Sequence, residues 1–292
     1  MNKEHRLAQL LVRSWPFPRG SGRIIDRFFR DLPFNEEIAT VSTTDDFKMT
    51  VPPNDAVGRH IYLSGEFDRS IVQLLVAFST PGDVLLDVGA NLGYVTSCFL
   101  KRVPDSIAIA VEPQPIIVDL LRKNLAQFGD RQRVFPVALS NENGEAWFYV
   151  DLLNKGKSRL VPPKFAGAQR IEARATSEFL AELPLQRIDL FKIDVEGHEQ
   201  KILESAKDWL RSMQPKVIVF EGNKGPTDSD GGPIGLLLKE IGYTVYGLRK
   251  RLLNLSLEPL ATKNVNTYND YVAVSKSRSI PPEARQAFGV DL

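Results

Sequence analysis

A chain of 292 residues with 43% hydrophobic and 25% charged residues has the composition of a folded globular protein, which argues against the disordered and membrane classes. No apolar run approaches the roughly 18–20 residues that cross a bilayer, and Arg13 interrupts the first apolar run, so we expect a cytoplasmic protein without a transmembrane segment. The formal net charge of +1 predicts no general attraction to nucleic acid, and the single cysteine, Cys98, excludes an intramolecular disulfide.

The first 60 residues are expected to form a helical or irregular extension. Apolar residues recur at helical spacing over residues 24–32, with Arg23, Arg27 and Arg30 on the other side of the predicted helix. Residues 1–30 carry seven basic and only two acidic side chains. The apolar stripe has three candidate partners: the rest of the chain, which is the plainest interpretation, a second subunit in a homodimer, or an anionic surface.

Strands and helices alternate along residues 61–276, which we predict to form the main domain, followed by a surface tail over residues 277–292. Strands are predicted at residues 84–88, 107–111, 133–137, 188–193 and 217–220, and helices at residues 69–78, 92–102, 116–128, 199–211 and 234–241. This alternation predicts a parallel sheet covered on both faces. Residues 244–248 and 271–274 are predicted strands without an intervening helix, which indicates an antiparallel pair at the sheet edge. The irregular stretches 151–168 and 222–232 are where we expect specificity for a substrate.

A glycine turn joins the first of these strands to its helix, in the sequence Asp87-Val-Gly89-Ala90-Asn91-Leu-Gly93. Gly89 permits a tight turn and a close approach of backbone to a ligand, and Gly93 is expected to let the helix pack close to the strand. Asn91 replaces the second glycine of the dinucleotide pattern, which argues against NAD or FAD. Asp87 is then available to an ammonium group or a water molecule. A purely structural glycine turn is the alternative.

Glu112 and Pro113 end the second strand, and Glu112 lies 19 residues after Gly93. A carboxylate at this position can accept two hydrogen bonds from a ribose diol, because ligands of open α/β sheets bind beyond the carboxyl ends of the strands. The alternative is an acidic N-cap for the following helix.

The ordered set of motifs resembles the FkbM family of class I methyltransferases over about residues 60–222. The set comprises the glycine turn, Glu112-Pro113, Ala138-Leu139-Ser140 with Gly144, and Lys192-Ile-Asp194-Val-Glu196-Gly197-His198-Glu199. The resemblance implies a Rossmann-like fold with a mostly parallel seven-stranded sheet and S-adenosylmethionine (AdoMet) as cofactor. It also implies O-methylation of sugars, polyketides or similar small molecules. By the same resemblance the glycine turn faces the methionine part of AdoMet, Glu112 the ribose, and Ala138 and Leu139 the adenine.

Ionisable residues are densest over residues 188–199, at the end of a buried strand. Removal of a hydroxyl proton requires a base, for which Asp194 and Glu196 are the leading candidates and His198 the third. A buried lysine needs a carboxylate partner, and Asp194, Glu196 or Glu221 can provide one for Lys192. An ion-paired strand end that caps the next helix is the alternative.

Contacts with the acceptor are expected from Lys192, Glu221 and Asn223. Asp194, Glu196 and Glu221 also form an oxygen-rich set suited to Mg²⁺, but no spacing requires an ion and we predict no metal site. Two competing functions are a catalytically silent AdoMet-binding or scaffold domain and a nucleotide-linked enzyme on a Rossmann sheet.

Overall fold

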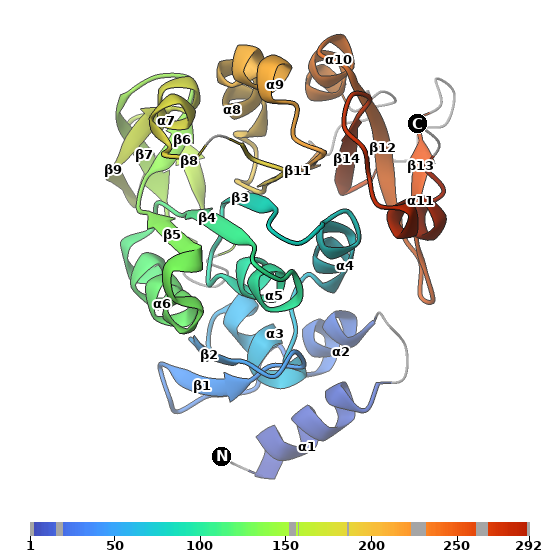
Figure 1. The fold of residues 1–292 in the computed structure, drawn as a ribbon. Coiled ribbons are helices and arrows are strands. Elements are labelled where there is room, and N and C mark those ends of the chain that lie inside the picture. Colours follow the sequence, from blue (N-terminus) through green and yellow to red (C-terminus); the bar gives the residue numbers. More distant parts are fainter. Residues whose placement is uncertain are drawn as a thin grey trace.

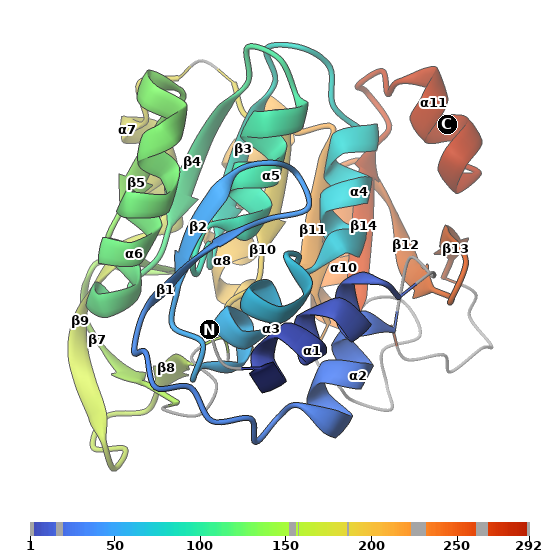
Figure 2. The same cartoon turned by 90° about the horizontal axis from the view of Figure 1, so that it is seen from below.

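An eight-stranded sheet crosses the middle of the protein, and helices cover both of its faces (Figures 1 and 2). The computed structural model describes residues 3–15, 20–151, 156, 158–185, 187–222, 232–260 and 268–290. In spatial order the strands are β13 (Leu255–Pro259), β12 (Tyr243–Lys250), β14 (Asp270–Ser275), β11 (Val217–Glu221), β10 (Leu190–Ile193), β3 (Val84–Val88), β4 (Ile107–Val111) and β5 (Gln132–Phe135).

The pairs from β11 across to β5 are parallel, whereas the pairs from β11 out to β13 are antiparallel. The predicted α/β class with an antiparallel edge is therefore confirmed. The expected number of seven strands is wrong, because β13 pairs with β12 as an additional edge strand in the described part of the chain.

Side chains that alternate along the central strands divide between two apolar cores. Leu85 belongs to the core on the side of α4 (Arg69–Ala77), α5 (Tyr94–Arg102) and α6 (Pro115–Leu125), and Leu86 to the core on the other side. That second core is covered by α7 (Thr176–Glu182), α8 (Glu199–Ser205), α9 (Lys207–Met213) and α10 (Gly232–Glu240). The single helix expected over residues 199–211 is in fact two, which meet at buried Ala206. The helix expected to reach residue 128 ends at Leu125 and continues as the 3-10 helix η1 (Ala126–Arg131).

A second, four-stranded sheet lies beside the β5 end of the main sheet (Figure 1). Its order is β6 (Ala138–Ser140), β9 (Ala168–Ala175), β7 (Gly144–Tyr149) and β8 (Arg159–Val161). The sequence did not predict this sheet, and β8 lies inside the stretch 151–168 that we expected to be irregular. Many side chains of β7 and β9 are exposed or half-buried, so these strands lack the apolar pattern that marks a buried strand.

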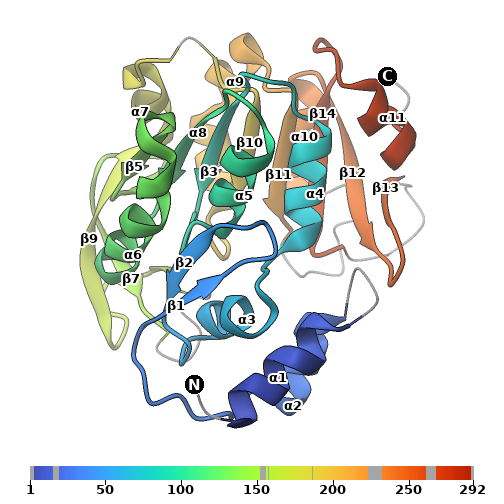
Figure 3. The same ribbon diagram turned by 60° about the horizontal axis from the view of Figure 1, so that its bottom comes forward.

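The N-terminal extension packs as a layer of helices and a hairpin under the carboxyl ends of the parallel strands (Figure 3). It contains α1 (Lys3–Arg13), α2 (Ser21–Phe28), β1 (Ala39–Ser42), β2 (Lys48–Val51) and α3 (Ala56–Ser64). Ile25 of the predicted stripe is fully buried, so this part of the stripe packs against the rest of the chain. The helix α3 runs across the boundary that we predicted at residue 60.

The C-terminal segment is also packed against the fold. Helix α11 (Pro282–Phe288) contacts α4, and the rings of Phe288 and Phe78 lie 5.6 Å apart. None of the helices in the described residues combines the length and the apolar character needed to cross a membrane.

Candidate functional site

One cavity of about 230 Å³ lies at the carboxyl ends of the adjacent strands β4, β3 and β10. In open α/β sheets this edge is where ligands bind. Three other parts of the fold complete the wall: α3 with Ala56 and Val57, the second sheet with Phe148 and Leu160, and the segment before α4 with Phe67. The cavity is therefore closed by elements that are distant from the central strands in sequence.

Most of the predicted site residues line this cavity. The residues that do so are Gly89, Ala90, Asn91, Glu112, Pro113, Ala138, Leu139, Lys192, Asp194, Glu196 and His198. Asp87, Gly93 and Glu221 are not part of its lining, and Asn223 lies outside the described residues. The structure therefore brings together residues from four separate motifs.

Glycine is needed at positions 89 and 93 of the turn for two different structural reasons. Gly89 has φ 77°, and a Cβ atom there would lie 1.8 Å from the carbonyl oxygen of Asp194, so only glycine fits between β3 and the end of β10. Gly93 has φ 82°, and its Cβ would lie 2.6 Å from Leu121 Cδ1 on α6. The expectation that Gly93 allows close packing against the strand is therefore corrected: it makes room for the neighbouring helix.

Glu112 links the end of β4 to the glycine turn through a hydrogen bond. Its carboxylate is 6% exposed and accepts hydrogen bonds from the backbone N–H groups of Asn91 and Gln114, both at 3.0 Å. Burial raises the pKa of Glu112 to about 7, although the two backbone donors favour the charged form. The N-cap position of α6 is Gln114, so the alternative role of Glu112 as the N-cap residue is wrong.

A buried ion pair joins Asp87 and Lys192 on adjacent strands: Lys192 is part of the cavity lining, and Asp87 is not. The carboxylate of Asp87 accepts hydrogen bonds from Lys192 Nζ at 3.1 Å and from Thr96 Oγ1 at 2.6 Å. Lys192 Nζ also donates to the carbonyl of Gly89 at 3.3 Å and lies 3.7 Å from Asp194 Oδ2. Burial acts to lower the pKa of Lys192, but Asp87 and Asp194 outweigh it and hold that pKa above its ordinary value. The lysine is therefore a charged structural link.

The expected carboxylate partners of Lys192 included Asp194 but not Asp87. The parallel pairing of β10 with β3 places Lys192 directly opposite Asp87. That register was the missing information, because the sequence alone does not show which residues of two strands are neighbours.

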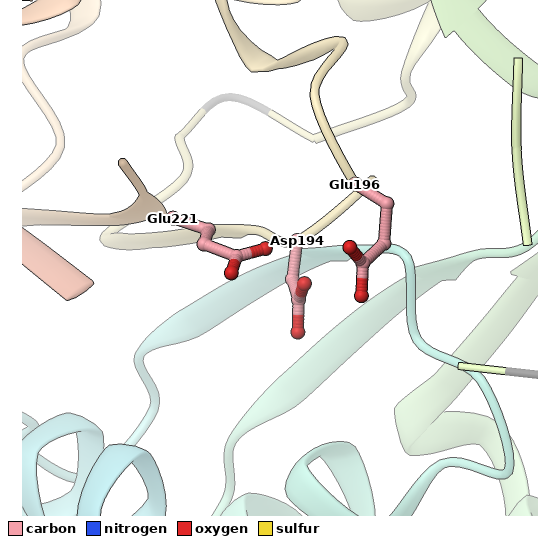
Figure 4. A group of neighbouring side chains, drawn as sticks. All are labelled: Asp194, Glu196 and Glu221. Atoms are coloured by element: carbon pink, nitrogen blue, oxygen red, sulfur yellow. The ribbon is translucent and has the colours of Figure 1, made fainter. Parts of the chain in front are cut away.

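Three carboxylates gather at the ends of β10 and β11, and Figure 4 shows them converging. One oxygen of each of Asp194, Glu196 and Glu221 lies within 4.8 Å of the other two. Burial, together with the negative charges of Asp194 and Glu196, raises the pKa of Glu221 to about 7. The carboxyl group of Glu221 therefore still holds a proton in part of the neutral pH range, so it can exchange a proton there.

His198 occupies the N-cap position of α8 and lines the same cavity. Its Nε2 atom is 2.9 Å from Ser140 Oγ. Burial, and then the charge of Lys201, lowers the pKa of His198 to about 4, so the imidazole is neutral at physiological pH. Glu199 is 2% exposed and accepts hydrogen bonds from the N–H groups of Val195 and Gly197. It holds the turn that carries Glu196.

Asp68 and His60 are among the cavity residues that were not found from the sequence. Asp68 precedes α4 with φ 44°, and burial raises its pKa to about 6 while the charge of Lys250, 3.8 Å away, acts in the opposite direction. His60 lies in the cavity wall, and its Nε2 atom is 2.8 Å from Asp26 Oδ1. Neither residue belongs to a local motif, so only the folded arrangement identifies them.

Comparison with known proteins agrees with this arrangement. Residues 87–245, more than half of the chain, match the model of the family described as Methyltransferase FkbM domain. The chain belongs to this family. The matched segment begins at Asp87 and includes Glu112, Lys192 and Asp194.

Curated relatives carry related names. The chain is 30% identical over 158 residues to 2-O-methyltransferase NoeI of Sinorhizobium fredii, covering 49% of this chain and 63% of NoeI, which is less than two thirds of that protein. It is 25% identical over 182 residues to Hexuronic acid methyltransferase AglP of Haloferax volcanii, covering 62% and 73%. It is 30% identical over 197 residues to 31-O-demethyl-FK506 methyltransferase FkbM of Streptomyces tacrolimicus, covering 56% and 74%. A solved FkbM methyltransferase from Methylobacillus flagellatus is 15% identical with a TM-score of 0.43, covering 67% of this chain and 44% of that one.

Proposed function

We propose that this protein transfers a methyl group from AdoMet to a hydroxyl oxygen of a small acceptor such as a sugar or a polyketide. The observation that carries the proposal is that the glycine turn, Glu112 and Asp194 end three adjacent parallel strands and line one cavity. Family membership supports the reaction type, and two of the relatives have names that specify an O-methyl position.

The charge of the cavity favours a cationic, phosphate-free nucleoside. Four carboxylates line it, those of Asp68, Glu112, Asp194 and Glu196. Lys192 is the only lysine or arginine in the described lining, and it already pairs with carboxylates. A dinucleotide would place its pyrophosphate among these negative charges, whereas the sulfonium of AdoMet is attracted to them. This contrast argues against the nucleotide-linked alternative.

The residues that would hold AdoMet follow from their places in the wall. Glu112 is the acceptor for the ribose hydroxyls, and the backbone around Gly89 approaches the methionine part. Val137, Ala138 and Leu139 offer an apolar surface for adenine. We revise the role of Asp87, which is fully buried and outside the cavity lining: it supports the turn through Lys192 and does not meet the ligand ammonium itself.

When bound, AdoMet supplies an electrophilic methyl group, so the protein has to orient the acceptor hydroxyl and remove its proton. Asp194 and Glu196 face the cavity, and Glu221 lies behind them with a pKa of about 7. We propose that these three carboxylates take up the proton of the acceptor hydroxyl, and that Asp194 or Glu196 receives it first. Neutral His198 then serves as a hydrogen-bonding residue, since a pKa of about 4 makes it a weak base. Acceptor contacts of Lys192 and Asn223 remain part of the proposal.

The test combines binding with transfer. Calorimetry should give micromolar affinity for AdoMet, and both Gly89→Arg and Glu112→Ala should abolish or strongly weaken it. Labelled methyl groups should then appear on members of a panel of hydroxylated acceptors. A larger thermal shift with NAD than with AdoMet would contradict the proposal. Binding without transfer to any acceptor would favour the catalytically silent domain.

A further inference from the structure

Helix α1 is apolar on two opposite sides. Ala8 and Val12 on one side are buried against the rest of the chain. On the other side Leu7, Leu10 and Leu11 are 58%, 64% and 54% exposed. A surface helix of a globular protein normally presents polar residues to water, and a helix that is apolar all round is normally covered. The outer side of α1 therefore has the composition of a contact surface.

The neighbouring helix adds to this surface. Helices α1 and α2 pack against each other and against α3 (Figure 3). Phe28, the last residue of α2, is 73% exposed. We call Leu7, Leu10, Leu11 and Phe28 the outer apolar set. These four residues belong to two short helices at one end of the molecule.

Basic side chains accompany the outer apolar set. The exposed basic residues of this region are Lys3, Arg6, Arg23, Arg27 and Arg30, while the guanidinium of exposed Arg13 donates to the backbone carbonyls of Leu63 and Ser42; up to residue 30 the acidic residues are Glu4 and Asp26. Asp26 already accepts a hydrogen bond from His60. The rest of the chain offsets this excess, because the formal net charge of the whole protein is only +1. The surface is thus locally cationic and apolar at once.

We propose that α1 and α2 dock on an anionic membrane surface. Leucine and phenylalanine side chains that enter the interface, flanked by lysine and arginine that meet anionic headgroups, are the combination that binds a helix to such a surface. A second copy of the chain fits less well, because a two-fold contact would bring the same basic side chains together. A nucleic acid duplex would neutralise the charge but would leave the leucines without an apolar partner.

The proposed membrane-docking surface and the cavity belong to the same helical layer but use different residues, so this docking does not depend on the proposed catalytic function. The side chains of Gln9 and Arg13 on α1 donate to the carbonyls of Tyr62 and Leu63 at the end of α3. The beginning of α3 supplies Ala56 and Val57 to the cavity. The membrane-facing surface and the cavity wall therefore belong to one helical layer, but they use different residues.

The test is co-sedimentation of the full chain with vesicles. One set contains phosphatidylcholine with roughly one-third phosphatidylserine, and the other contains phosphatidylcholine alone. Leu7→Asn/Leu10→Asn removes part of the apolar set at exposed positions, so the fold should persist. The matched control is Leu252→Asn/Leu253→Asn, which changes two leucines that are 48% and 69% exposed elsewhere on the surface. Far-ultraviolet circular dichroism confirms folding of both variants.

We expect the protein to bind the anionic vesicles, and about tenfold less of it to bind when Leu7 and Leu10 are replaced or the salt is raised to about 0.5 M. The control variant should bind as the unchanged protein does. Absence of binding, or equal binding to neutral vesicles, would overturn the proposal. A dimer in sedimentation velocity that Leu7→Asn/Leu10→Asn dissociates would also overturn it and would assign the surface to a second copy.

Discussion

Two groups of charged residues lie at the same edge of the sheet and behave in opposite ways. The pair of Asp87 and Lys192 is buried and internally neutralised, with hydrogen bonds to both carboxylate oxygens. The group of Asp194, Glu196 and Glu221 places three like charges within 4.8 Å, and the pKa of Glu221 rises to about 7. Neutralised charges therefore fix the geometry of this edge, and we propose that the charges in excess carry its proton chemistry.

The largest expected effect comes from breaking the neutralised pair. Lys192→Met should lower the free energy of unfolding by about 3–5 kcal/mol, because Asp87 would remain buried without its partner. Urea unfolding measures this. The double variant Asp87→Leu/Lys192→Met should recover much of the loss, since no buried charge is left. A cost below about 1 kcal/mol for Lys192→Met would show that the pair does not hold the edge together.

A smaller effect, on binding alone, is expected at Glu112. Glu112→Ala should weaken the binding of S-adenosylhomocysteine by roughly 10–100-fold, because hydrogen bonds from the ribose to a charged acceptor are lost. Calorimetry measures the affinity. Glu145→Ala, an exposed carboxylate on β7, is the control and should leave the affinity unchanged. Equal losses in the two variants would remove Glu112 from the cofactor site.

The ribose contact also predicts a pH dependence. Because the pKa of Glu112 is about 7, this residue loses its charge as the pH falls below about 7, and affinity for S-adenosylhomocysteine should fall with it, by up to about tenfold per pH unit. Glu112→Gln should remove this dependence. Titrations at several pH values measure it, and an unchanged slope in Glu112→Gln would assign the dependence to another group.

Removing a charge from the group of Asp194, Glu196 and Glu221 should stabilise the protein, whereas breaking the pair of Asp87 and Lys192 should destabilise it. The folded pKa of Glu221 lies above its ordinary value, so its contribution to stability is full at low pH and is lost as the pH rises through about 7. Glu221→Gln should therefore stabilise the protein at pH 8, by about 1 kcal/mol once solvent screening of this half-buried group is included. If Glu221 takes up a proton during the reaction, kcat should rise as the pH rises through about 7, and Glu221→Gln should flatten this rise. Thermal unfolding at pH 5 and pH 8 measures the first effect, and a destabilised variant at pH 8 would contradict it.

The smallest effect is expected at His198. Burial is the main reason for its low pKa and Lys201 the second, so Lys201→Ala should raise this pKa by less than about one unit. The histidine should stay neutral at pH 7 in both proteins. Nuclear magnetic resonance titration of the imidazole checks this, and a pKa near the ordinary value in the unchanged protein would refute the buried placement.

The parallel core and its ligand-binding edge could be predicted because their signals are local. The strand before Asp87, the glycine turn and Glu112 each follow from a short run of residues, and the structure gathers Gly89, Glu112 and Asp194 as expected. The partner of Lys192 could not be predicted in the same way, since Asp87 becomes its neighbour only through strand register. Pairing between elements is a property of the whole fold.

The covering elements of the site were the least predictable part. Phe148 and Leu160 come from a second sheet with largely exposed or half-buried strands, and Asp68 and His60 come from the N-terminal side of the domain. None of these four residues stands in a periodic pattern that marks its role, because what each one does depends on which distant element it packs against.

The most direct test of the account is a crystal structure with S-adenosylhomocysteine. We predict that the ribose hydroxyls contact the Glu112 carboxylate and that the adenine lies against Ala138 and Leu139. The Lys192–Asp87 contact should remain unchanged. A ligand bound elsewhere, or in this cavity with its ribose away from Glu112, would contradict the central claim.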